Sequence, residues 1–123
     1  MGYFFLFSCY NNPYQILKAG GRTMPAYLML TTLTDAGRKV LQENPEALRD
    51  INKEVEFMGV KTLCQYALLG QYDFVRILEA PSNEAIAKLA IRLSAQGTTQ
   101  TLTLAAINIE DLIQTLKERK NPW

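Results

Sequence analysis

The stretch that decides the fold is VKTLCQYALLGQYDFVRILEA, residues 60–80. It contains two runs rich in β-branched and aromatic residues, 60–69 and 73–80, which are typical of strands. Only Gly70-Gln71-Tyr72 separates them. Because parallel strands need a crossover of a dozen or more residues, a link this short predicts an antiparallel hairpin.

The chain before this hairpin reads as a strand followed by a helix. Residues 25–33 alternate in a β-rich row and predict the first strand. Thr34 or Asp35 is placed to cap a helix, whose apolar residues recur at helical spacing as far as position 58. Pro45 predicts a break within this helix, and Gly59 predicts its end.

The chain after the hairpin repeats the same order. Ser82 or Asn83 is placed to cap a second helix, which Gly97 ends. A threonine-rich strand is expected at 98–107, and Asn108 then caps a last amphipathic helix. The order strand, helix, strand, strand, helix, strand predicts an α+β, ferredoxin-like βαββαβ fold with a four-stranded antiparallel sheet, both crossover helices on one face, and an added C-terminal helix.

This arrangement leaves the second face of the sheet bare within one chain. Alternation predicts that this face is mainly apolar, and an exposed apolar surface of that size favours packing against a second copy. We therefore expect a homodimer or a higher oligomer. The side chains expected on the bare face are Tyr27, Met29, Thr31, Cys64, Tyr66, Leu68, Phe74, Arg76, Leu78, Thr101 and Thr103.

Composition excludes several classes of function. The chain has 123 residues, 48% of them hydrophobic, and a net charge of +1, so it fits one globular domain and offers no strong field toward nucleic acid or a membrane. It contains no histidine, which removes the usual zinc ligand, the proximal haem ligand and the Ser-His and Cys-His triads. We expect no metal or haem cofactor. Two cysteines without a CxxC spacing favour the cytoplasm.

Residues 1–23 differ from the rest of the chain. Their aromatic run at positions 3–7 is far too short to span a membrane, and no basic residue precedes it. The alternatives are a disordered extension, a weak interfacial anchor, or upstream sequence added by a misassigned start. The expected domain therefore comprises residues 24–123.

Five residues form a candidate site for a small anionic or polar ligand near the hairpin. Tyr72 and Asp73 begin the third strand, Arg76 follows on it, Tyr66 lies on its hairpin partner, and Tyr27 belongs to a neighbouring strand. Without histidine, Asp73 is the candidate base, provided that desolvation raises its pKa.

Each of these residues also has a structural interpretation. Tyr72 packs in the turn, and Asp73 bonds backbone amides there. Arg76, expected on an apolar face, needs an anionic partner, which could be Asp73, Glu79, the second subunit or a carboxylate ligand.

The chain resembles the GYD family, small proteins of the dimeric α/β-barrel group, over residues 25–106. The resemblance implies the ferredoxin-like fold and dimerisation, but no established reaction. It rests on Met24-Pro25-Ala26-Tyr27, Leu33-Thr34-Asp35-Ala36-Gly37-Arg38, Leu69-Gly70-Gln71-Tyr72-Asp73-Phe74-Val75 and Glu79-Ala80-Pro81.

Three functions agree with these observations. The first is a homodimeric module that binds a small molecule without metal or haem. The second is a cofactor-independent isomerase or monooxygenase-like enzyme that uses tyrosine, aspartate and arginine side chains. The third is an interaction subunit whose last helix and Trp123 tail dock on a larger complex. The sequence leaves open whether the chain catalyses a reaction at all.

Overall fold

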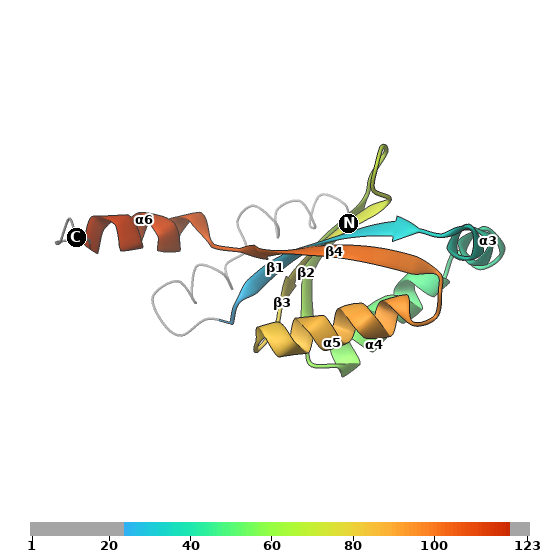
Figure 1. The fold of residues 1–123 in the computed structure, drawn as a ribbon, viewed down its shortest axis with the longest axis horizontal. Coiled ribbons are helices and arrows are strands. Elements are labelled where there is room, and N and C mark those ends of the chain that lie inside the picture. Colours follow the sequence, from blue (N-terminus) through green and yellow to red (C-terminus); the bar gives the residue numbers. More distant parts are fainter. Residues whose placement is uncertain (1–23, 119–123) are drawn as a thin grey trace.

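The computed structural model describes residues 24–118, which form four strands and four helices (Figure 1). The expected extension 1–23 and the Trp123 tail lie outside the described residues. The elements, in chain order, are β1 (Ala26–Leu33), α3 (Asp35–Glu43), α4 (Ala47–Phe57), β2 (Lys61–Ala67), β3 (Phe74–Glu79), α5 (Asn83–Ser94), β4 (Thr99–Ala106) and α6 (Ile109–Glu118).

The strands form one sheet in the order β2-β3-β1-β4, and every neighbouring pair is antiparallel. Helices α4 and α5 lie on one side of this sheet, and α6 extends away from it beyond the end of β4 (Figure 1). These observations confirm the predicted α+β fold with its hairpin and its four-stranded antiparallel sheet. The break expected near Pro45 is also present, between α3 and α4.

Side-chain caps fix where three of the helices begin. The Thr34 hydroxyl oxygen accepts a hydrogen bond from the Gly37 amide at 3.1 Å, and the Ser82 hydroxyl oxygen accepts one from Ala85 at 3.2 Å. The Asn108 side chain accepts one from an amide in the first turn of α6 at 2.8 Å. Each cap satisfies an amide that has no partner within its helix. Thr34 and Ser82 were each one of two predicted cap residues, and Asn108 was predicted alone.

The hydrophobic core lies between the sheet and helices α4 and α5. Met29 and Leu78 of the sheet and Leu89 of α5 are completely buried there, and Val55 of α4 closes the core from the other helix. Burying a side chain of this size stabilises the fold by about 1.5–3 kcal/mol. The helices therefore hold one face of the sheet by ordinary core packing.

The prediction of which side chains face away from the helices was wrong for most of the set. Tyr27, Met29 and Leu78 belong to the core, and Thr31 and Arg76 are buried on the same face. Their cross-strand partners Phe74, Thr101 and Thr103 share that face. Alternation fixes which residues lie together but not which face they occupy when both sets are apolar.

The two remaining strand residues of that set, Cys64 and Tyr66, do lie on the face away from the helices. They pair with Ile77 and Val75, whereas Arg76 pairs with Gln65. A register shift between Thr62 and Cys64 displaces the early part of β2 relative to β3. A β-bulge of this kind changes which side chains share a face, and the sequence contains no clear signal for it.

Candidate interaction site

The strongest candidate for a functional surface is the sheet face opposite α4 and α5, here called the open face. Cross-strand pairing places its side chains in rows: Leu28 lies between Ile77 and Leu104, and Leu30 lies between Val75 and Leu102. Tyr66 continues the second row on β2. The open face is thus defined by Leu28, Leu30, Tyr66, Val75, Ile77, Leu102 and Leu104.

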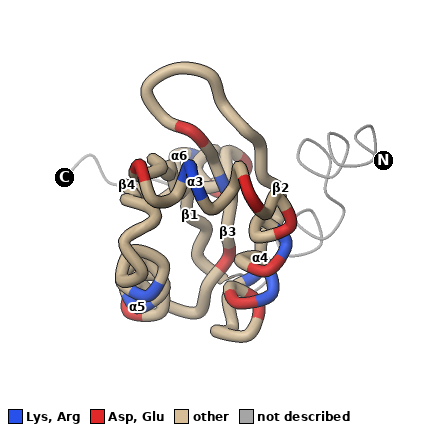
Figure 2. Tube along the Cα trace, turned by 90° about the vertical axis from the view of Figure 1, so that its right-hand side faces the viewer, with Lys and Arg blue, Asp and Glu red and all other residues tan. Residues whose placement is uncertain are grey.

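Exposure distinguishes the two faces at the edge strand β4, although Cys64 on the open side of β2 is 1% exposed. Leu102 and Leu104 are 45% and 49% exposed, whereas Met29 and Leu78 on the covered face are 0% exposed. None of the seven defining residues carries a charge. Charged residues gather instead along α3, α4 and α5 (Figure 2). An uncharged apolar surface rimmed by polar residues is typical of a protein–protein contact.

Helix α6 adds a second exposed apolar surface. Ile109, Leu112, Ile113 and Leu116 follow the spacing of a single helical stripe, and all four are 38–65% exposed. No residue of this ten-residue helix is buried. Isolated helices of this length are marginal in water, so covering the stripe would stabilise α6.

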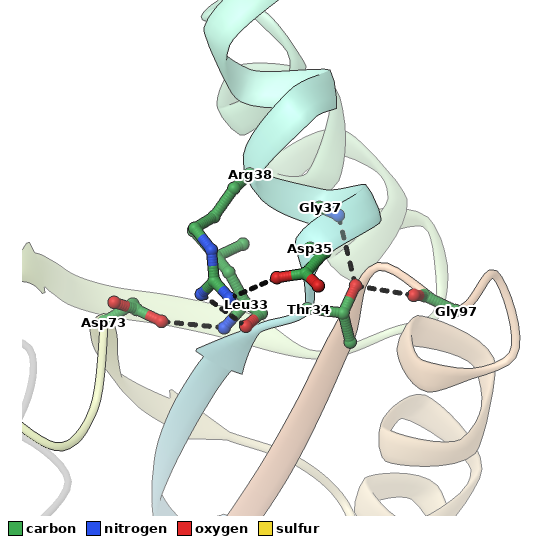
Figure 3. Close-up of polar contacts among 7 residues, drawn as sticks. All are labelled: Leu33, Thr34, Asp35, Gly37, Arg38, Asp73 and Gly97. Atoms are coloured by element: carbon green, nitrogen blue, oxygen red, sulfur yellow. Dashed lines mark hydrogen bonds and ion pairs between the residues drawn. The ribbon is translucent and has the colours of Figure 1, made fainter.

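The Gly70-Gln71-Tyr72-Asp73 segment of the hairpin is hydrogen-bonded to the end of β1. One Asp73 carboxylate oxygen accepts a hydrogen bond from the Leu33 amide at 2.7 Å (Figure 3). The Asp73 amide donates to the Thr31 carbonyl at 2.8 Å. Asp73 therefore ties the turn before β3 to the end of β1. This matches the structural interpretation, in which Asp73 bonds backbone amides.

The end of β1 is also held from its other side. The Thr34 hydroxyl donates to the Gly97 carbonyl at 2.7 Å while it caps α3 (Figure 3). A Cβ atom at Gly37 would lie 2.1 Å from the Thr98 carbonyl oxygen, so only glycine allows this approach. The segment 33–38 thereby contacts both the turn before β3 and the loop before β4, which holds the end of β1 and the start of β4, two strands that carry the open face.

The structure does not bring the five candidate ligand residues together. Tyr27 lies on the covered face, where its hydroxyl bonds the Asn83 side chain at the start of α5. Tyr66 lies on the open face, Tyr72 lies in the hairpin turn, and the carboxylate of Asp73 bonds the end of β1. Arg76 shares a face with Tyr27 only, because Tyr66 points to the opposite side of the sheet.

Arg76 differs from the other four candidate residues because it is a buried positive charge. It is only 5% exposed, and its Nε donates to the Gln65 side-chain oxygen at 3.1 Å. Within residues 24–118 no ion pair joins it to a carboxylate. Burial lowers the pKa of its guanidinium, which reflects the cost of removing this charge from water. Gln65 was not predicted as its partner, although its place beside Arg76 follows from the strand pairing.

A cavity of about 300 Å³ lies where the start of β1 meets the end of β4, and it includes Tyr27, Asn83 and Asp111.

In the described part of the chain, no group of three His, Cys, Asp or Glu side chains is arranged to hold a metal ion. None of the helices between residues 24 and 118 is long and apolar enough to cross a membrane.

Comparison with known proteins adds to this description. A curated protein of Thermus thermophilus, named glutamine synthetase and cystathionine beta-lyase binding protein, is 43% identical over 95 residues. The alignment covers 76% of this chain and 100% of that protein. The crystal structure of the leucine response regulatory protein LrpA from Mycobacterium tuberculosis matches with a TM-score of 0.50 and 17% identity.

The match to LrpA covers 68% of this chain and 51% of the LrpA chain, so this chain corresponds to about half of that protein. At such low identity the likeness supports the ferredoxin-like fold alone. The GYD domain family matches residues 27–116. Together with the relative from T. thermophilus, this match means that the chain belongs to the GYD domain family.

Proposed function

We propose that this chain is a homodimeric interaction module that binds an enzyme and acts through that contact. The observation that carries the proposal is the presence of two separate exposed apolar surfaces, the open face and the stripe of α6. A monomeric protein rarely leaves two such surfaces to water. One surface is assigned to a second copy of the chain, and the other to the partner enzyme.

The open face is the surface assigned to the second copy. Its seven defining residues are uncharged, so a face-to-face contact of two copies through them buries no charge of these residues, and Glu79 on the same side of the sheet lies at the end of β3. Sheets that pack in this way form an apolar layer about 10 Å thick. The resulting assembly is the dimeric α/β barrel expected from the family resemblance.

The stripe of α6 is the surface assigned to the enzyme. The helix extends away from the sheet (Figure 1), and its apolar residues are exposed, so the stripe is available to a partner other than the second copy. An amphipathic helix of this kind binds by laying its stripe into an apolar groove of a partner. The name of the T. thermophilus relative supports an enzyme as the partner, since the two proteins align over the full length of that relative.

The test uses purified glutamine synthetase and cystathionine beta-lyase from the organism that supplies this chain. We expect the full chain to bind at least one of the two in calorimetry, and Leu112→Asp to weaken that binding at least tenfold. Gln114→Glu adds the same charge on the polar side of α6 and should bind like the wild type. Binding that is equal for both variants, or absent with both enzymes, would contradict the proposal.

A further inference from the structure

A small cavity lies under the helices on the covered face. Arg76 and Thr31 contribute to it from the sheet, Ile51 and Glu54 from α4, and Leu93 from α5. Its volume is about 30 Å³. One water molecule needs roughly 10–15 Å³ by the same measure, so the cavity admits a group of two or three heavy atoms.

Two polar groups at this cavity have unused hydrogen-bonding capacity. The Thr31 hydroxyl is buried and has no partner within the described residues. Arg76 makes one side-chain hydrogen bond there, from Nε to Gln65, which leaves its two terminal nitrogens without a protein acceptor among residues 24–118. Buried polar groups are nearly always paired, and a buried guanidinium in particular requires an anion.

The carboxylate that lines this cavity is already engaged elsewhere. Glu54 lines the same cavity, but its Oε2 lies 2.6 Å from the Nε of Arg92, with which it forms an ion pair near the surface. The other two candidates from the sequence do not serve either. The Asp73 carboxylate accepts a hydrogen bond from the Leu33 amide. Glu79 lies opposite Ala26 in the strand register, and by alternation its side chain is on the other side of the sheet from Arg76.

We propose that this cavity binds the carboxylate group of a small monocarboxylate. The planar guanidinium of Arg76 offers two parallel donors, which match the two oxygens of a carboxylate, and the Thr31 hydroxyl supplies a third donor. A phosphate, with five heavy atoms, is too large for the cavity, whereas a formate ion has three. This site is independent of the two surfaces proposed for protein binding, because it lies on the covered face.

Sodium formate is the probe for the test, and perchlorate, a poor hydrogen-bond acceptor, keeps the ionic strength constant. We expect a saturable shift of the Arg76 Nε–H signal in NMR spectra of the full chain, together with a rise of several degrees in melting temperature near saturation. Arg76→Gln should abolish the dependence of the melting temperature on formate, whatever its own stability.

Thr31→Val provides a second variant that keeps the shape of the side chain. We expect it to fold normally and to bind formate about three- to tenfold more weakly, because it loses one hydrogen bond. Thr62→Val is the matched control: its hydroxyl is also buried without a partner in the described region, but it does not line the cavity. Absence of a saturable shift in the wild type, or a formate response that survives Arg76→Gln, would overturn the proposal.

Discussion

The two faces of the sheet differ in a way that is opposite to the usual relation between polarity and exposure. The covered face holds Arg76 and Thr31, a charge and a hydroxyl, under α4 and α5. The seven residues that define the open face are all apolar or aromatic, and Leu104 among them is 49% exposed. This difference supports both proposals, a protein partner for the open face and a bound carboxylate under the helices on the covered face.

Truncating a core side chain should lower the stability of the covered face more than any other change. Leu89 in α5 is 0% exposed and packs on the sheet, so Leu89→Ala should lower the free energy of unfolding by about 2–5 kcal/mol in urea titrations. Ile91 on the same helix is 70% exposed and serves as the control, with an expected loss below about 0.5 kcal/mol on mutation to alanine. Equal losses would mean that α5 does not pack as described.

Replacing Asp73 tests the hydrogen bond that ties the turn before β3 to the end of β1. Asp73→Ala removes a charged acceptor and leaves the Leu33 amide without its partner, which should cost about 1.5–3 kcal/mol of unfolding free energy. Asp35→Ala removes an exposed carboxylate from the same region and should cost less than about 1 kcal/mol. If Asp73→Ala instead leaves stability unchanged, the structural interpretation of the motif is wrong.

Gly37 tests the close contact between α3 and the loop before β4. Replacing a helical glycine with alanine ordinarily stabilises a helix by about 1 kcal/mol. Here the new Cβ would meet the Thr98 carbonyl oxygen at 2.1 Å, so Gly37→Ala should destabilise the fold by about 1–3 kcal/mol. Thermal unfolding shows whether the variant is less or more stable than the wild type. A higher melting temperature for the variant would contradict the contact.

Thr31→Val is the substitution with the smallest expected effect on the free energy of unfolding. Its hydroxyl has no partner among the described residues, so in buffer free of carboxylates the variant should lie within about 0.5 kcal/mol of the wild type or be slightly more stable. Thr34→Val, by contrast, loses a helix cap and should cost about 1 kcal/mol. A large loss for Thr31→Val would reveal a protein partner for this hydroxyl.

Much of the fold could be predicted because its signals are local. The three-residue link at Gly70 sets the hairpin, Pro45 interrupts the first helical region, and the caps at Thr34, Ser82 and Asn108 each depend on side chains within one turn of the helix start. Together these features determine the order of the elements and therefore the topology of the sheet.

The faces could not be assigned because their difference depends on long-range packing. Both alternating sets of β1 contain large hydrophobic side chains, Tyr27 and Met29 in one and Leu28 and Leu30 in the other, so the sequence of β1 does not indicate which set meets the helices. The register shift in β2 then separates Tyr66 from Arg76. For the same reason the five candidate ligand residues did not converge, and the pairing of Arg76 with Gln65 was not found.

Light scattering on the full chain tests the central claim, that two copies associate through the open face. The wild type should have twice the mass of one chain at micromolar concentration, and Leu104→Glu should have the mass of a single chain, because it places a charge on the apolar face, beside Leu28. Ile91→Glu makes the same change on the outer side of α5 and should remain a dimer. A monomeric wild type, or a Leu104→Glu variant that is still dimeric, would contradict the account.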